Sequence, residues 1–156
     1  MRSAVMSVPE RAAHGCLSLA ALVDRVQPLF AIALRIYVAR VFFLSGITKL
    51  HDWNITLALF RNEYHVPVLP PALAAVLGTG AELGLPVLLL LGCGTRIAAA
   101  ALFAFNIVAV ISYAGLSPAG LKDHVLWGTL LLVLFFYGPG KLSIDHWLLR
   151  KVGSTD

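Results

Sequence analysis

The sequence predicts an all-α integral membrane protein built as a bundle of four transmembrane helices. The chain of 156 residues is 59% hydrophobic and only 13% charged. A soluble domain is typically about 45–50% apolar and about 25% charged. The mean hydropathy is +0.85. Four separate stretches each approach the roughly 20 apolar residues that are needed to cross a bilayer, so nearly the whole chain is used in membrane spans.

The segments between these stretches are short, which favours an up-and-down antiparallel bundle. Ser117-Pro118 is a good helix start, because a capping hydroxyl precedes a proline at the first helical position. Gly138-Pro139-Gly140 is a good helix end, since neither residue type continues a helix readily. The four predicted spans are residues 29–50, 69–91, 96–114 and 118–137.

Each terminal segment is predicted to carry a short helix at the membrane surface. Residues 143–151 combine an apolar face with basic residues near the end, and residues 12–26 carry a similar apolar face. Such amphipathic helices lie in the interfacial plane of a bilayer. The chain is therefore divided into an N-terminal segment (1–28), a four-span domain (29–141) and a C-terminal tail (142–156).

The basic residues predict the orientation of the bundle, because Lys and Arg collect in cytoplasmic loops. The basic residues at the end that holds both termini are Arg2, Arg11, Arg25, Arg96, Lys141, Arg150 and Lys151. Those at the opposite end are Lys49, Arg61 and Lys122. This rule places both termini in the cytoplasm. The same rule explains the excess of 12 basic over 8 acidic residues, so no nucleic-acid partner is expected.

Three strongly polar residues, Arg40, Glu82 and Asn106, lie near the middle of predicted spans. An ionisable group in hydrocarbon costs roughly 2.5–3.5 kcal/mol on insertion scales, so it usually faces a partner or a water-filled cavity. Glu82 is the strongest candidate, because small residues around it favour close helix packing. Pro86, four residues later, has no backbone N–H and therefore leaves the Glu82 backbone carbonyl without its helical hydrogen-bond donor. Glu82 is either a proton relay or half of a structural ion pair.

Arg35 and Arg40 are the candidate charge partners of Glu82. Counting about 1.5 Å per residue places Arg40 near the depth of Glu82 and Arg35 roughly 7 Å nearer the cytoplasm. The two arginines are separated by about 140° on a helical wheel, so they cannot both point at one carboxylate, and the choice stays open. Asn106 either completes this polar layer or forms an ordinary interhelical hydrogen bond, worth about 0.6 kcal/mol on average.

A second polar group is expected on the side opposite the termini, around Lys49, His51, His65 and His124. Histidines with nearby acids could bind a transition metal, hydrogen-bond a quinone head group or transfer protons, or simply be solvated. No spacing matches HExxH or a paired CxxC, so no metal site is predicted. Lys49, His51 and His124 are the candidate contacts for a quinone or for proton transfer.

Four motifs in order along the chain resemble those of the DoxX family of small bacterial membrane proteins. They are Arg35 with Phe42, Gly46, Lys49 and Leu50; Gly80-Ala81-Glu82-Leu83-Gly84; Leu91-Gly92-Cys93-Gly94-Thr95-Arg96; and Gly138-Pro139-Gly140-Lys141-Leu142-Ser143-Ile144-Asp145. The resemblance covers roughly residues 34–147. Arg35, Lys49, Glu82 and Arg96 match family positions, whereas Arg40 falls where the family is usually apolar.

The resemblance implies a four-helix protein of the bacterial inner membrane. It also implies an accessory or anchoring subunit of a quinone-linked redox complex or a stress-response complex, because the family is named after a subunit of a terminal quinol oxidase. Its partners would be the lipid bilayer, other proteins of the complex and further copies of the chain. The sequence contains no haem-ligating histidine pair, CxxC or dinucleotide fingerprint, so a self-sufficient enzyme is not expected.

Two other functions remain open from the sequence. The first is a non-enzymatic scaffold or chaperone, in which the polar residues serve packing specificity. The second is a small transporter subunit with the polar layer as its substrate site. Four spans are few for a transporter, and no inverted repeat is visible.

Overall fold

The computed structural model describes the backbone of residues 8–152 and the side chains of residues 17–151. Within this part of the chain, the secondary structure is helical apart from one isolated bridge between Tyr64 and Tyr113. The helices are α1 (Val8–His51), α2 (Trp53–Asn62), α3 (Pro71–Leu91), α4 (Thr95–Ser112), α5 (Pro118–Tyr137) and α6 (Ile144–Val152). Four of them (α1, α3, α4 and α5) are long and apolar enough to cross a membrane, which confirms the predicted all-α, four-span fold.

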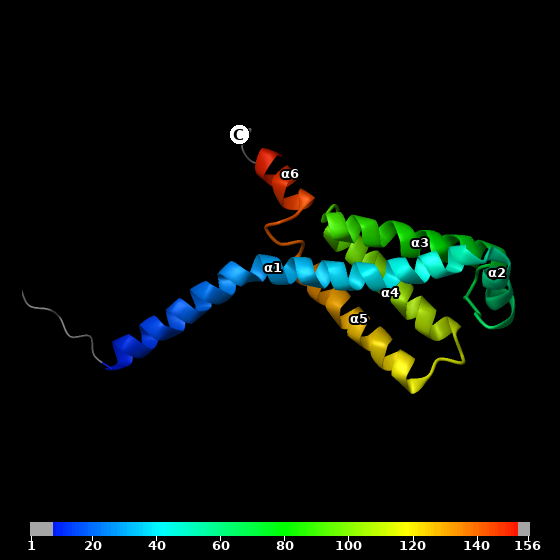
Figure 1. Cartoon of the computed structure of the whole chain (residues 1–156), viewed down its shortest axis with the longest axis horizontal. Coiled ribbons are helices and arrows are strands. Elements are labelled where there is room, and N and C mark those ends of the chain that lie inside the picture. Colours follow the sequence, from blue (N-terminus) through cyan, green and yellow to red (C-terminus); the bar gives the residue numbers. More distant parts are fainter. Residues whose placement is uncertain (1–7, 153–156) are drawn as a thin grey trace, which may run out of the picture.

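The largest difference from the predicted elements is at the start of the chain. Helix α1 is continuous over 44 residues and contains Pro28, so the predicted surface helix over 12–26 is not a separate element. A proline inside a helix removes one backbone hydrogen bond and kinks the helix without necessarily ending it. Figure 1 shows the blue N-terminal part of α1 projecting beyond the bundle at an angle to the cyan part. Arg2 lies outside the described residues, as does the side chain of Arg11.

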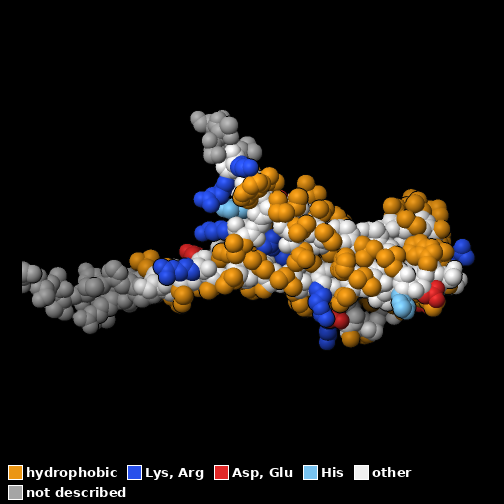
Figure 2. All heavy atoms as spheres, turned by 45° about the horizontal axis from the view of Figure 1, so that its top comes forward, with side chains coloured by type: hydrophobic (Ala, Val, Ile, Leu, Met, Phe, Trp, Pro, Cys, Tyr) orange, Lys and Arg blue, Asp and Glu red, His pale blue; other side chains and the backbone are white. Residues whose placement is uncertain are grey.

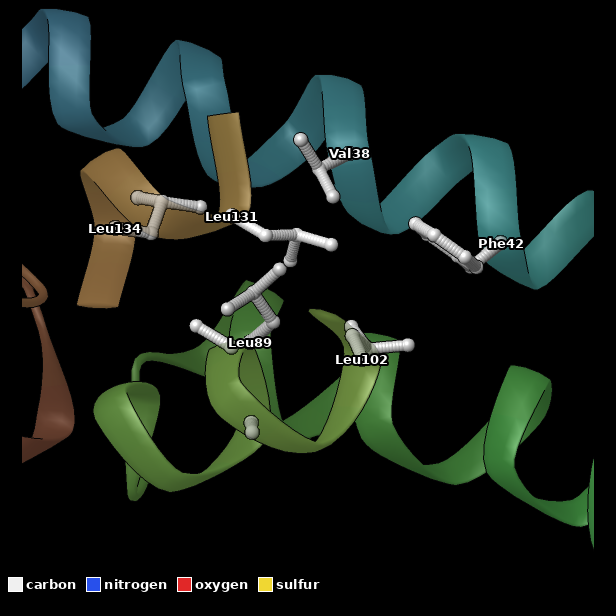
Figure 3. Packing of buried hydrophobic residues seen from close by; sticks show 8 residues of the cluster. Val38, Phe42, Leu89, Leu102, Leu131 and Leu134 are labelled. Atoms are coloured by element: carbon white, nitrogen blue, oxygen red, sulfur yellow. The ribbon is translucent and has the colours of Figure 1, made fainter. Parts of the chain in front are cut away.

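The core of the bundle is formed by side chains from all four spanning helices. Figure 3 shows six of them pointing toward one another: Val38, Phe42, Leu89, Leu102, Leu131 and Leu134, each at most 3% exposed. Helix α1 packs mainly on α3, and α4 packs on both α3 and α5. Because lipid is as apolar as these side chains, close van der Waals packing rather than the hydrophobic effect holds such helices together.

The contact between α1 and α3 is close because of Gly46. A Cβ atom added there would lie 2.9 Å from the Leu83 side chain and 3.1 Å from Glu82 Cβ. The face of α1 that carries Arg35, Phe42 and Gly46 is buried, as the helical wheel indicates. This close approach brings Glu82 against the last turns of α1.

Helix α2 folds back over the bundle. Asp52 caps its start by accepting hydrogen bonds from the backbone N–H groups of Asn54 and Ile55, an arrangement that stabilises helix N-termini. Phe60 packs on Ala74 and Ala75 of α3. Helix α2 therefore has one face packed on protein. Elsewhere, Figure 2 shows hydrophobic side chains over most of the visible face of the bundle, as expected for a lipid-facing surface.

Candidate functional site

The most polar buried group lies where α1 meets α3, and it consists of Ser45, Lys49 and Glu82. Lys49 Nζ donates a hydrogen bond to Glu82 Oε1 at 2.8 Å and lies 2.7 Å from Oε2. Ser45 Oγ donates to the same Oε1 at 3.0 Å, and Lys49 Nζ donates to Ser45 Oγ at 3.0 Å. The Glu82 side chain is only 6% exposed and that of Lys49 18%. A buried carboxylate is thus neutralised by a cation that still reaches the surface.

This pairing differs from the arginine partners considered from the sequence. Lys49 lies three residues beyond Gly46 and shares the buried face with Arg35. At about 1.5 Å per residue, the nine and 14 residues that separate Arg40 and Arg35 from Lys49 correspond to roughly 14 and 21 Å along α1. The estimated depth of Arg40 was wrong because α1 extends well beyond the bundle, so hydropathy does not show which part of it lies beside α3.

The ion pair lies in the wall of a cavity of about 410 Å³ enclosed by α1, α2, α3, α4 and α5. Most of the wall is apolar or aromatic, and it includes Phe60, Leu77 and Phe105. The remaining polar lining residues are Ser45, Tyr64, Ser112, Tyr113 and His124. The Ser112 hydroxyl is buried and has no hydrogen-bond partner among the described residues. Proteins bind drug-sized ligands in such spaces, which are mostly apolar with a few placed polar groups.

A second cavity, of about 600 Å³, adjoins the first one. Ser45, Lys49, Phe60 and Tyr64 line both cavities, and His51 with Asp52 lines the second. The Lys49–Glu82 pair therefore separates an apolar interior from a more polar space at the end of α1. Such a position suits the exchange of a proton between the two spaces.

Asn106 and His124 join α4 to α5 at this end of the bundle. Asn106 Nδ2 donates to the His124 carbonyl at 2.9 Å, and His124 Nδ1 lies 2.7 Å from Asn106 Oδ1. Since the amide oxygen can only accept, Nδ1 carries the proton in this arrangement, and a neutral His124 ring keeps Nε2 as a free acceptor. Asn106 therefore positions a histidine that lines the cavity.

Tyr64, in the loop after α2, and its aromatic neighbours Phe60 and Tyr113 line part of the cavity wall. The Tyr64 ring lies 5.1 Å from Phe60 and 5.2 Å from Tyr113, measured between ring centres. The backbone N–H of His65 donates to the Ser112 carbonyl at 2.8 Å and ties this loop to α4. Burial, with smaller contributions from Tyr113, Glu63 and Glu82, raises the pKa of Tyr64, so its hydroxyl remains a hydrogen-bond donor at neutral pH. Tyr64 and Ser112 carry no signal as site residues in the sequence, because only the folded loop brings them together.

Arg35 lies at the opposite end of the bundle and is only 2% exposed. Its Nη2 group donates to the Leu142 carbonyl. Gly92 adopts a left-handed conformation (φ 69°), and a Cβ atom there would overlap Arg35 Nη1 and come within 2.6 Å of Ser143. We call the cluster of Arg35, Gly92, Leu142, Ser143 and Asp145 the Arg35 end, and the opposite end of the bundle the Lys49 end.

Asp145 connects the chain segments at the Arg35 end. Its carboxylate accepts hydrogen bonds from the backbone N–H groups of Gly94 (2.7 Å) and Thr95 (2.9 Å), and its own N–H donates to the Gly92 carbonyl at 2.9 Å. It thus caps the start of α4. Burial favours a higher pKa for Asp145, but these hydrogen bonds and the charge of Arg35 outweigh it and lower the pKa below its ordinary value.

Two further predicted site residues, like Arg35 and Asn106, do not line the main cavity. Arg40 is exposed and lies beside a groove between α1 and α3. His51 is exposed and lines only the second cavity. Between residues 17 and 151, no group of three or more His, Cys, Asp or Glu side chains is placed to hold a metal ion.

Comparison with known proteins identifies the family. The sequence pattern of the DoxX family matches residues 30–115. An uncharacterized protein of Haemophilus influenzae is 32% identical over 129 residues, covering 78% of this chain and 84% of its own length. No solved structure matches the chain. The matched region holds the Lys49–Glu82 pair and most of the cavity lining. The chain is therefore a multi-pass membrane protein of the DoxX family.

Proposed function

We propose that the protein binds a quinone, or a closely similar lipid-soluble molecule, in the cavity at the Lys49 end. It would serve there as an accessory subunit of a quinone-linked complex in the bacterial inner membrane. The supporting observation is the position of the Lys49–Glu82 ion pair in the wall of an apolar cavity of about 410 Å³. An amphipathic ring with polar substituents matches this combination of apolar walls and a few polar atoms.

The polar lining residues match both redox forms of such a ligand. The carbonyl oxygens of a quinone can accept hydrogen bonds from the Lys49 ammonium group and from the hydroxyls of Tyr64 and Ser112. The hydroxyls of a quinol can donate to His124 Nε2 or to Glu82. Each group would therefore act by binding and orienting the ring, with Asn106 holding His124 in position.

Glu82 has the additional role of a proton relay in this proposal. Oxidation of a quinol to a quinone releases two protons and two electrons. The two electrons pass to a redox centre of a partner protein, and the two protons, accepted one after the other by Glu82, can leave through the second cavity, which Lys49 also lines. With the Arg35 end in the cytoplasm, as the basic residues indicate, these protons are released on the periplasmic side.

The binding test uses purified full-length protein in nanodiscs and short-chain benzoquinone and naphthoquinone analogues. Quinones quench tryptophan fluorescence, and the Trp127 ring lies 4.9 Å from the His124 ring, between centroids. We expect saturable quenching that is lost in Ala109→Leu, which fills the cavity from α4 and leaves Lys49 and Glu82 in place in the sequence. Ala100→Leu, on the exposed face of α4, is the matched control and should bind like the natural chain.

Two outcomes would contradict the proposal. If quenching is absent, or equally strong in Ala109→Leu, the cavity is not a quinone site. If Glu82→Gln changes only stability or the recovery of partner proteins, with no effect on quinone binding or quinone-linked activity, Glu82 has no proton role. The non-enzymatic scaffold function would then replace the redox function.

A further inference from the structure

The groove between α1 and α3 carries a charge on a surface that should face lipid. Arg40 is exposed, and it is surrounded by Ile36, Phe43, Leu44, Val87 and Leu90, which with Ala39 and Pro86 line a groove of about 260 Å³. Arg40 forms no hydrogen bond or ion pair with any described residue. An arginine exposed to hydrocarbon is energetically costly, and such residues usually have a partner. We propose that this groove binds a transmembrane helix of another protein, with an Asp or Glu side chain facing Arg40.

The depth of Arg40 supports a partner within the membrane. Five residues separate it from Arg35, which corresponds to roughly 8 Å along the helix. Arg35 lies at the depth where α3 ends and α4 begins, because it is next to Gly92 and interacts electrostatically with Asp145. Arg40 is therefore inside the bundle's span rather than at its edge.

The shape of the adjoining surface favours a helix rather than a lipid chain. Gly80, Gly84 and Val87 share the exposed face of α3, and Val87 lines the groove. A Cβ atom at Gly80 or Gly84 would meet no other described part of the chain within 4 Å. Small residues around Glu82 favour packing within the bundle on sequence grounds, but Gly80 and Gly84 face outward. Glycines four residues apart let a second helix approach closely in a membrane.

The charge pattern also argues against an anionic lipid and against a second copy. Lipid head groups are usually held by several basic residues, and Arg40 is the single charged residue in this groove. A second copy inserted in the same direction offers no carboxylate at this depth among its described residues. Its Glu82 lies near Gly46 and is already paired with Lys49, and Asp123 lies near the start of α5. One partner carboxylate matches one guanidinium in a bidentate pair.

The test is photo-crosslinking of the full chain in its native membrane. A photoreactive amino acid replaces Val87, and a matched control replaces Ile107, which is 46% exposed on α4. We expect position 87 to crosslink to a transmembrane peptide that contains Asp or Glu, identified by mass spectrometry. Arg40→Leu should reduce this product by about tenfold, the factor expected for one strong interhelical polar contact. Gly84→Leu should also reduce it, because the larger side chain blocks the close approach of the partner helix.

Charge reversal gives the decisive measurement. Arg40→Glu should abolish the crosslink, and replacing the partner's carboxylate by Arg should restore it. Crosslinks from position 87 only to lipid, to a second copy, or to a helix without a carboxylate would overturn the proposal. An unchanged product in both Arg40→Leu and Gly84→Leu would also overturn it. Quinone binding by the cavity does not depend on this groove, so the two proposals can fail separately.

Discussion

The two ends of the bundle use similar charges for different purposes. At each end a basic residue on the same face of α1 interacts with an acid from another element: Lys49 forms an ion pair with Glu82, whereas Arg35 acts on Asp145 only through its charge and donates its hydrogen bond to the Leu142 carbonyl. At the Lys49 end the pair borders a cavity of about 410 Å³. Beside Arg35 the space is filled, because a Cβ atom at Gly92 would overlap the guanidinium, and the cavity of about 630 Å³ at this end is lined by other residues, including Leu34, Gly140 and Lys141. The available space, rather than the type of charged residue, distinguishes a candidate binding site from a structural contact.

The family motifs divide between the same two ends. Three of the four motifs meet at the Arg35 end, where Gly92, Gly94 and Thr95 bind Asp145 and Arg96 lies against Gly138. The glutamate motif meets Gly46 and Lys49 at the other end. The Arg35 end thus ties α1, α3, α4 and the chain after α5 together. We infer that it holds the bundle in the geometry that encloses the cavity.

The largest effect is expected from filling the space at Gly92. Gly92→Ala combines left-handed strain, about 1–2 kcal/mol, with overpacking against Arg35 and Ser143, typically 1–3 kcal/mol. We expect a loss of about 3 kcal/mol in the free energy of unfolding, measured by denaturant titration in detergent. Gly94→Ala is the matched control, because Gly94 has a similar φ of 58° and open space around it. Equal losses in both variants would show that strain alone matters at this end.

Removing the cation at the Lys49 end should have an effect of similar size. Lys49→Met leaves the Glu82 carboxylate buried without its partner, which typically costs 3–5 kcal/mol. We expect about 3 kcal/mol, the lower limit, because Lys49 is 18% exposed. The double variant Lys49→Met/Glu82→Gln should recover most of this stability and still lose quinone quenching. A double variant as unstable as the sum of the two single variants would exclude direct coupling.

A smaller effect is expected at the contact between α1 and α3. Gly46→Ala would push against Leu83 at 2.9 Å and Glu82 at 3.1 Å, so a loss of about 1 kcal/mol in unfolding free energy is expected from mild overpacking. Gly84→Ala, which adds the same atom in open space, should be neutral or stabilising, since Ala favours helix over Gly. Thermal unfolding of the two variants in one detergent measures the difference. If Gly46→Ala leaves the unfolding free energy unchanged, α1 and α3 can move apart without loss of stability.

Much of this fold could be predicted from the sequence, because hydropathy and helix punctuation report local properties. The bounds of α5 match the prediction, and those of α3 and α4 differ from it by at most two residues. The buried face of α1 also follows from helical periodicity. The partner of Glu82 could not be predicted in this way, since it depends on how far α1 is displaced along α3. Gly46 carried a usable signal, because a glycine on a buried face marks the point of closest approach.

The smallest effect concerns the pH dependence of the Arg35 end. The pKa of Asp145 is lowered by its backbone hydrogen bonds and by Arg35, so its contribution to stability is fully present above the ordinary value of about 3.9. That contribution is lost as the pH falls through the lowered folded-state pKa. Asp145→Asn should therefore be less stable than the natural chain at pH 7 and show a weaker loss of stability between about pH 5 and pH 2. The melting temperatures of the natural chain and of Asp145→Asn across that pH range measure this effect. Their difference reports on Asp145 alone, because the two proteins share all other carboxylates. Parallel curves would mean that Asp145 stabilises α4 through hydrogen bonds that do not depend on its charge.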